Sequence, residues 1–208
     1  MSHVFITGNS RGIGLALSEE FQRSGLGVSG CSSKHSGGVV NLDAMRFFAA
    51  ANPETNILVC NAGVCLSGVA EDVSVLLQNL SVNLIGVANS VAAFLPGLRV
   101  LAANKVGDGI SFAIAALGSG WGQSPGKAGF AAYSASKHAL EGYMGVLARE
   151  IAGDKGVAVV IDPGVVDTAL NPSIRTRGAK ADAVAKAMVE VLLGLKSSDN
   201  GRRISLGS

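Results

Sequence analysis

The sequence predicts an α/β domain built on a doubly wound parallel sheet of about six to seven strands, with helices on both faces. Short β-branched or apolar runs alternate with segments in which apolar residues recur at helical spacing, as expected for a parallel sheet with crossover helices. The run Ile57–Cys60 is apolar throughout, which is typical of a strand covered on both sides. The sequence shows no internal repeat or linker, so residues 1–208 are expected to form one domain.

Composition and charge narrow the classes of protein to which this chain can belong. Hydrophobic residues make up 48% of the sequence and charged residues only 15%, against a usual charged share of about 25%. Much of the chain is therefore expected to be buried, part of it in a subunit contact. The net charge of +2, without a basic stripe, argues against a nucleic-acid partner or a membrane surface.

The sequence predicts neither a targeting segment nor a metal site. An apolar strand begins within the first four residues, which leaves no room for a secretory signal. No apolar run approaches the ~18 residues of a membrane-spanning helix, so we expect a cytoplasmic protein. Three cysteines without paired spacings and three scattered histidines predict no metal ligands.

The first predicted unit is a strand, a glycine loop and a helix. Val4–Thr7 is followed by a loop that contains Gly8, Gly12 and Gly14, and helical spacing begins at Leu15. Glycines let backbone N–H groups approach a phosphate, and a helix N-terminus favours its negative charge. The loop is thus either a pyrophosphate site or a simple strand-to-helix turn. It does not fit the Walker pattern, because no Gly-Lys-Ser/Thr closes it.

The end of the second predicted strand, Gly27–Cys31, bears on the choice of cofactor. Dinucleotide-binding folds often place a carboxylate here to hold the adenosine ribose, whereas this sequence has Ser32, Ser33 and Lys34. Without a carboxylate, and with Arg11 and Lys34 available, a 2′-phosphate is favoured, so we expect NADP rather than NAD. The alternative is that both cations are ordinary exposed side chains.

The middle of the chain continues the alternation. Val39–Leu42 is predicted to be a third short strand, with Asn41 near the adenine, and Asp43–Ala51 a brief helix. The strand Ile57–Cys60 leads into Asn61–Gly63, small residues that suit a ligand at the carboxyl end of a strand.

A long helical pattern follows from Glu71 to Leu95, and Pro96 is predicted to end it. Asn83 is embedded in this pattern. A buried amide must find hydrogen-bond partners, so Asn83 is either a satisfied structural amide or part of a proton path.

The second half of the chain begins with a strand over Gly109–Ala116, a Gly/Ser/Pro-rich loop over 118–129 and a helix over Tyr133–Ile151. The remaining predicted elements are a strand over Val157–Ile161, a mobile polar flap over 171–180, a helix over Ala181–Leu195 and a last edge strand over Arg202–Leu206.

Tyr133 and Lys137 form a candidate acid–base pair. Residues four apart on a helix share one face, about 6 Å apart along the axis. A phenol has an unperturbed pKa of about 10, and a neighbouring ammonium favours its charged form. A phenol so placed can exchange a proton near neutral pH. An isolated Tyr-x-x-x-Lys is more often a boundary aromatic followed by a solvated lysine. Other motifs in the sequence are needed to choose between this interpretation and an acid–base pair.

Five motifs occur in an order and rough spacing that resemble the short-chain dehydrogenase/reductase family. They span nearly the whole chain and are Thr7-Gly8-x-x-x-Gly12-x-Gly14, Asn61-Ala62-Gly63, Asn83, Tyr133-x-x-x-Lys137 and Pro163-Gly164-x-Val166-x-Thr168. The chain is compact for that family, and its short connections are similar to those of the smaller carbonyl-reductase-like members. The resemblance implies a Rossmann fold that binds NADP(H).

The resemblance also implies roles for individual residues. Tyr133 would be the general acid that protonates a carbonyl oxygen as hydride arrives from the nicotinamide. Lys137 would lower the pKa of Tyr133 and bind the nicotinamide ribose, and Asn83 would position a water. The implied cofactor contacts are Gly8, Ser10, Arg11, Gly12, Ile13 and Gly14 at the phosphates, Ser32, Asn41 and Leu42 at the adenosine, Asn61, Ala62 and Gly63 in the middle, and Pro163, Gly164, Val166 and Thr168 at the nicotinamide, with Tyr133 and Lys137.

One position departs from the family pattern. The family usually carries a serine just beyond the fifth strand, whose hydroxyl polarises the substrate oxygen. The strand register places Ala115 there, so the usual catalytic serine is predicted to be missing. Counting back from Tyr133 instead reaches Gly120, next to Ser119, which would serve if its loop folds inward. The loss of one donor to a developing oxyanion costs about 10²- to 10³-fold in rate.

Two functions follow from these residues. The first is NADPH-dependent reduction of a carbonyl or similar C=X group of a small molecule, with Tyr133 as the acid tuned by Lys137. The second, motivated by Ala115, is a non-redox protein on the same frame: a cyclase, isomerase or lyase that uses Tyr133, or a cofactor-binding module. The long helices offer more apolar surface than one sheet face needs, and the resemblance implies that they pair in a homodimer or homotetramer.

Overall fold

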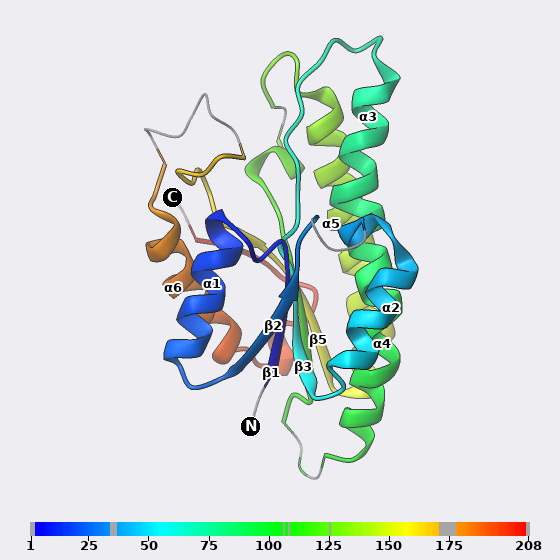
Figure 1. Cartoon of the computed structure of the whole chain (residues 1–208), viewed down its shortest axis with the longest axis vertical. Coiled ribbons are helices and arrows are strands. Elements are labelled where there is room, and N and C mark those ends of the chain that lie inside the picture. Colours follow the sequence, from blue (N-terminus) through cyan, green and yellow to red (C-terminus); the bar gives the residue numbers. More distant parts are fainter. Residues whose placement is uncertain are drawn as a thin grey trace.

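A computed structural model of the chain describes residues 3–33, 37–105, 107, 109–124, 126–170 and 178–206, and it confirms the doubly wound α/β architecture (Figure 1). The sheet is parallel throughout, with the strand order β2-β1-β3-β4-β5-β6. Its strands are β1 His3–Thr7, β2 Gly27–Cys31, β3 Thr55–Cys60, β4 Phe112–Leu117, β5 Gly156–Asp162 and β6 Arg203–Ser205.

Helices cover both faces of the sheet, as Figure 1 shows. α1 (Gly12–Arg23) and α6 (Ala181–Leu193) pack together on one side. α2 (Leu42–Ala51), α4 (Gly86–Ala103) and α5 (Ala131–Ile151) lie on the other, with α3 (Val73–Leu80) packed against α5. This arrangement encloses the sheet between two apolar layers.

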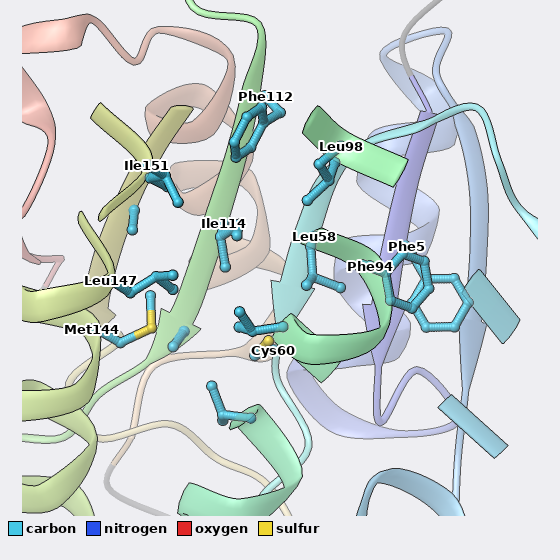
Figure 2. Close-up of a cluster of buried hydrophobic side chains, with 14 of the residues drawn as sticks. Phe5, Leu58, Cys60, Phe94, Leu98, Phe112, Ile114, Met144, Leu147 and Ile151 are labelled. Carbon is cyan, nitrogen blue, oxygen red and sulfur yellow. The ribbon is translucent and has the colours of Figure 1, made fainter. Parts of the chain in front are cut away.

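Alternation along β1 shows how one strand serves two cores. Phe5 faces the layer of α2, α4 and α5, where it contacts Phe94 at a ring-centroid distance of 4.5 Å and shares a buried cluster with Leu58 (Figure 2). Val4 and Ile6 face α1 and α6 instead. Successive side chains of a strand point to opposite faces. Because both faces are covered, the three central residues of β1, Val4, Phe5 and Ile6, are all apolar.

In open α/β sheets, a strand order of this kind creates a crevice at the carboxyl edge of the sheet. β1 lies between β2 and β3, so the crossover from β1 to β2 and the crossover from β2 to β3 leave the sheet in opposite directions. Ligands of open α/β sheets bind where the strand order reverses in this way. The loops after β1 and β3 meet at this point.

The predicted third strand over Val39–Leu42 is wrong. A 3₁₀ helix occupies Gly38–Val40, and Asn41 then caps α2 by accepting hydrogen bonds from the backbone N–H groups of Asp43 and Ala44 at 3.0 and 3.1 Å. The pattern of two valines and a leucine is too short to distinguish a strand from a helix entry. The capping ability of asparagine decides the outcome, because it satisfies N–H groups that α2 leaves unpaired.

The predicted helix end at Pro96 is also wrong. α3 continues through a π-helical turn, Ser81–Ile85, into α4, which runs past Pro96 to Ala103. Proline removes one backbone hydrogen bond from a helix interior. Phe94 and Leu98 flank it and are both buried in the sheet-facing core, so tertiary packing outweighs the lost bond.

The other strand and helix predictions agree with the structure within a few residues, including the edge strand β6, which pairs with β5. The predicted flap over 171–180 lies outside the described residues except for 178–180. The same holds for Lys34, on which part of the cofactor preference rests.

Replacing Pro96 by alanine is expected to stabilise the fold by about 2 kcal/mol. Proline is about 3 kcal/mol less favourable than alanine inside a helix, and its stiffening of the unfolded chain offsets about 0.4–1 kcal/mol of that. Urea unfolding measures the difference. Gly97→Ala is the matched control, since an added Cβ meets nothing within 4 Å there and the gain is limited to about 1 kcal/mol. A Pro96→Ala protein no more stable than the parent would contradict the interpretation.

Candidate active site

The loops after β1 and β3 are locked together at the crevice. The Asn61 side-chain amide donates to the backbone carbonyls of Thr7 and Gly8 at 2.9 and 3.0 Å. The Ala62 N–H donates to the Thr7 hydroxyl at 3.0 Å. These bonds satisfy backbone groups that would otherwise lack a hydrogen-bond partner at the ends of two parallel strands. Two motifs that are 53 residues apart in the chain thus form one surface.

Gly8 and Gly14 of the loop are both required by space, and Gly8 is also required by its conformation. Gly8 has a φ of +72°, and a Cβ on it would lie 2.9 Å from the Ala62 Cα. A Cβ on Gly14 would lie 2.2 Å from the Gly8 carbonyl oxygen. Only glycine fits at either position, and the backbone that results opens the N-terminus of α1 toward the crevice. This cradle fits a pyrophosphate.

The remaining predicted cofactor contacts named here lie on the segments that follow β1, β2 and β5. Gly12 packs against Thr168, whose Cγ2 would lie 3.4 Å from an added Cβ, so the glycine loop meets the segment after β5. Ser10 and Arg11 are exposed at the mouth, Ile13 packs into the core, and Ser32 is buried at the end of β2. Asn41 and Leu42 begin α2, so Asn41 lies at a helix cap rather than on a strand.

The segment after β5 is shaped by its own hydrogen bonds. The Asp162 carboxylate accepts from the Gly164 N–H at 3.0 Å, which turns the chain sharply after Pro163. Val166 then forms an isolated bridge with Ala179. The predicted nicotinamide contacts therefore stand on a structured turn at the carboxyl edge of β5.

Tyr133 and Lys137 lie one turn apart on α5, above the end of β4. Both are buried, with exposed fractions of 7% and 6%. The Lys137 ammonium donates to the Leu117 carbonyl at 2.8 Å and lies 5.9 Å from the centre of the Tyr133 ring. The predicted proximity of the two side chains is therefore present in the folded chain.

The pKa of Tyr133 departs from the expected direction. Burial raises it to about 12, and a hydrogen bond with the Ser119 side chain opposes that rise. The sequence-based expectation was that Lys137 would lower the pKa of this phenol. Desolvation sets the direction because burial disfavours the charged form of the phenol, and the negative charges of Cys65 and Asp162 act in the same direction. The phenol is thus held in its protonated, acid form.

The serine beside the tyrosine is Ser119. Its side chain lies beside the phenol, where it opposes the rise in the pKa of Tyr133, and its hydroxyl accepts from the Trp121 N–H at 3.3 Å, at the start of a 3₁₀ turn over Gly120–Gly122. Ala115 is fully buried within β4, on the face that packs toward α1 and α6. The loop after β4 folds inward, so the structure brings a hydroxyl to Tyr133 from the loop and not from the strand.

Asn83 is a fully satisfied amide in the π-helical turn. Its two N–H donors go to the Val64 carbonyl and the Ser136 hydroxyl, each at 2.9 Å, and its oxygen accepts from the Val64 N–H at 2.9 Å. Ser136 in turn donates to the Tyr133 carbonyl at 2.7 Å. Asn83 therefore ties the loop after β3 to the helix that carries Tyr133. Single π-helical turns inside α-helices are frequent at functional sites.

Lys137 is surrounded by groups that sequence motifs did not single out. Burial lowers its pKa to about 8, while Cys65, Glu141 and Asp162 oppose that effect. Cys65 follows β3, Glu141 lies one turn beyond Lys137, and Asp162 ends β5. The spacing of four between Lys137 and Glu141 could have indicated one helix face; the contributions of Cys65 and Asp162 have no local sequence signal.

An aromatic wall closes one side of the site. Trp121 meets the Tyr133 ring edge-on at 5.9 Å and the Phe130 ring at 5.2 Å. The Ser134 hydroxyl donates to the Trp121 carbonyl at 2.7 Å and fixes this loop on α5. The site can therefore offer a proton from Tyr133, a second hydroxyl from Ser119 and an apolar flat surface.

Comparison with known proteins agrees with this geometry. A family model described as short chain dehydrogenase matches residues 40–178. The chain is 38% identical over 98 residues to the NADPH-dependent pterin aldehyde reductase of Arabidopsis thaliana, a match that spans 45% of this chain and 39% of that protein. It is 29% identical over 187 residues to the cyclic-di-GMP-binding biofilm dispersal mediator protein of Escherichia coli (strain K12), across 82% of this chain and 75% of that protein.

A solved structure shares the whole fold. The 3-ketoacyl-(acyl-carrier-protein) reductase from Brucella melitensis, complexed with NADH, superposes with a TM-score of 0.86 over 99% of this chain and 96% of its own, at 21% identity. That likeness concerns the fold alone. The family model covers more than half of the chain and carries the assignment: the chain belongs to the short-chain dehydrogenase/reductase family, a family of oxidoreductases.

Proposed function

We propose that this protein is an NADPH-dependent reductase of a carbonyl or similar C=X group of a small molecule. The observation that carries the proposal is the buried Tyr133 phenol, which is held protonated, lies beside the Ser119 side chain and stands one helical turn from Lys137. A reductase needs a proton donor beside the oxygen that becomes an alcohol. The raised pKa of Tyr133 suits that direction of reaction.

The chain's own groups divide the work of such a reduction. NADPH, when bound, supplies the hydride that reaches the carbonyl carbon. Ser119 donates a hydrogen bond to the substrate oxygen as negative charge develops on it. Tyr133 gives its proton to the same oxygen, which completes the alcohol. Lys137, protonated below a pH of about 8, stabilises the phenolate that is left.

Glycines, a helix N-terminus and an arginine support NADPH as the cofactor. Gly8, Gly12 and Gly14 would hold the pyrophosphate at the N-terminus of α1, where the first helical turn carries no acidic residue. Arg11, exposed at the mouth, would bind the 2′-phosphate. The similarity to an NADPH-dependent reductase supports this preference.

The aromatic wall indicates the class of substrate. Trp121 and Phe130 offer flat apolar surface next to the acid, which favours a planar aromatic or heteroaromatic aldehyde or ketone. The partial similarity to a pterin aldehyde reductase points the same way. The non-redox alternative was motivated by Ala115; the position of Ser119 beside the phenol favours the reductase over it.

We also propose that the protein works as a homodimer or homotetramer. The continuous helix Val73–Ala103 contains an 18-residue stretch with a mean hydropathy of 1.6, and by length and composition alone this helix could cross a membrane. Only 33% of that stretch is buried within the protein. α4 nevertheless packs one side on the sheet. A second copy would cover exposed apolar side chains such as Leu77 and Val100.

Tyr133→Phe is expected to lower kcat for reduction of aromatic aldehydes by about 10²- to 10⁴-fold, since it removes the general acid. NADPH affinity, measured by fluorescence titration, should not change.

Ser119→Ala is expected to lower kcat for the same reduction by about 10²- to 10³-fold. Ser124→Ala is its control, because the Ser124 hydroxyl is exposed and donates to the Gly120 carbonyl of the same loop. Undiminished turnover in Tyr133→Phe would refute the mechanism.

Arg11→Gln is expected to weaken NADPH binding about ten- to a hundredfold and to leave NADH binding unchanged, because a hydrogen bond to a charged group contributes about 1.5–3 kcal/mol. Calorimetric titration with each cofactor measures this. Arg46→Gln, which removes an exposed arginine on α2 that pairs with Asp43, is the matched control. Equal losses for NADH and NADPH would show that Arg11 does not read the 2′-phosphate.

Light scattering at micromolar concentration is expected to give the mass of a dimer or tetramer. Leu77→Glu places a charge on the exposed face of α3 and should lower that mass. Leu193→Glu, on α6 at the opposite side of the sheet, serves as the control and should leave the mass unchanged. A monomeric parent protein would be incompatible with the proposed assembly.

A further inference from the structure

Arg203, at the start of the edge strand β6, makes contacts with three parts of the active site. Its Nη2 donates to the Ser119 carbonyl at 3.0 Å and also contacts the Asp162 carboxylate. Its Nη1 contacts the Glu141 carboxylate. The Arg203 and Asp162 side chains are only 14% and 11% exposed, so this network is largely removed from water.

Each contact reaches a different functional segment. Ser119 carries the hydroxyl that meets the Tyr133 phenol. Asp162 uses its other oxygen to hold the Gly164 N–H in the turn after β5. Glu141 lies one helical turn beyond Lys137 on α5. One guanidinium therefore joins the loop after β4, the turn after β5 and the helix of the acid.

The contact with the Ser119 carbonyl has a direct geometric consequence. The loop after β4 leaves the sheet at Gly118, whose N–H donates to the Ile161 carbonyl at 2.8 Å. A Cβ on Gly118 would lie 3.4 Å from the Arg203 Nη1, so the guanidinium packs directly on the loop. The bond from Arg203 to the Ser119 carbonyl thus fixes the backbone of the residue whose side chain lies beside the phenol.

We propose that Arg203 is a positioning residue of the reductase centre: it holds Ser119 in place against Tyr133, and its charge balances the carboxylates of Asp162 and Glu141 beside Lys137. This rests on the proposed reductase function. The fork of an arginine can bond several oxygens at fixed angles, which a lysine ammonium cannot do. Substitutions of Arg203 can therefore separate its positioning of Ser119 from the effect of its charge.

The charges around Lys137 set the direction of each pH effect. The titratable and charged groups near it are Tyr133 and Glu141 on α5, Cys65 after β3, Asp162 at the end of β5, and Arg203 on β6. In the parent protein kcat for reduction is expected to fall as pH rises through about 8, where Lys137 loses its proton. Tyr133, with a pKa raised to about 12, stays protonated throughout.

Three variants test the proposal in the full-length protein. Arg203→Lys keeps the charge and loses the fork, so kcat should fall about ten- to a hundredfold, part of the loss expected for one misplaced oxyanion donor, while the pH at which kcat falls stays unchanged. Arg203→Met loses both the charge and the fork, so kcat should fall and the pH at which kcat falls should rise. Glu141→Gln removes a carboxylate that raises the pKa of Lys137, so the pH should decrease. A merely structural role would not give shifts of opposite sign.

A second measurement does not depend on turnover. Trp121 is the single tryptophan of the chain and follows Ser119 in the same loop. Arg203→Lys and Arg203→Met are expected to increase the quenching of its fluorescence by acrylamide. Arg202→Lys and Arg202→Met are the controls, because Arg202 is exposed and pairs with Asp199. Circular dichroism checks that each variant is folded.

The two measurements distinguish the possible failures. If the parent protein reduces no carbonyl while the Arg203 variants alter the quenching of Trp121, the reductase function fails and the positioning of the loop stands. If Arg203→Lys matches Arg202→Lys in both kcat and quenching, the positioning role is overturned. If Arg203→Met and Glu141→Gln shift the pH dependence in the same direction, the charge-balancing role is overturned. Should Arg203→Met not fold, Arg203→Gln, which also removes the charge, replaces it in the comparison with Glu141→Gln, and Arg203→Lys still decides the positioning role.

Discussion

The burial of the Lys137 ammonium is the constraint on which the active centre depends. A charged group removed from water is unfavourable unless hydrogen bonds and opposite charges replace its hydration. The Leu117 carbonyl supplies the hydrogen bond, and Glu141 and Asp162 supply negative charge. Each comes from a different element, so Lys137 can be buried only when α5, β4 and β5 are correctly assembled.

A parallel sheet makes that assembly possible. All six strands end at the same edge, where each leaves backbone groups without a ladder partner. The chain satisfies these groups with side chains: Asn61 and Thr7 join the loops after β1 and β3, and Asp162 holds the turn after β5. The bonds that complete the fold at this edge therefore also build the candidate cofactor site and the candidate acid–base site.

In the proposed reductase, the network around Arg203 links an edge strand to the active centre. β6 is only three residues long, and it brings Arg203 within hydrogen-bond distance of Ser119, 84 residues earlier in the chain. Two carboxylates share one guanidinium there, and Lys137 carries the balancing positive charge. Displacing any member of such a group leaves another charge unpaired, which is unfavourable away from water.

The sequence by itself determined the alternation of strands and helices, the glycine loop and the pairing of Tyr133 with Lys137. These features depend on local periodicity, on the steric demands of Gly8 and Gly14, and on the turn of one helix, all of which act over a few residues. The sequence did not determine that Pro96 lies inside a helix or that residues 39–42 enter one, since core packing and the Asn41 cap decided against the local pattern.

Only the tertiary structure decided which hydroxyl reaches Tyr133, in which direction the pKa of that phenol moves, and that Arg203 lies at the site. The strand register favoured Ala115 because a strand has a fixed period, whereas the inward fold of the loop that carries Ser119 depends on contacts with Trp121, α5 and β6. The pKa of Tyr133 follows from burial, which is a property of the packed chain and of no single residue.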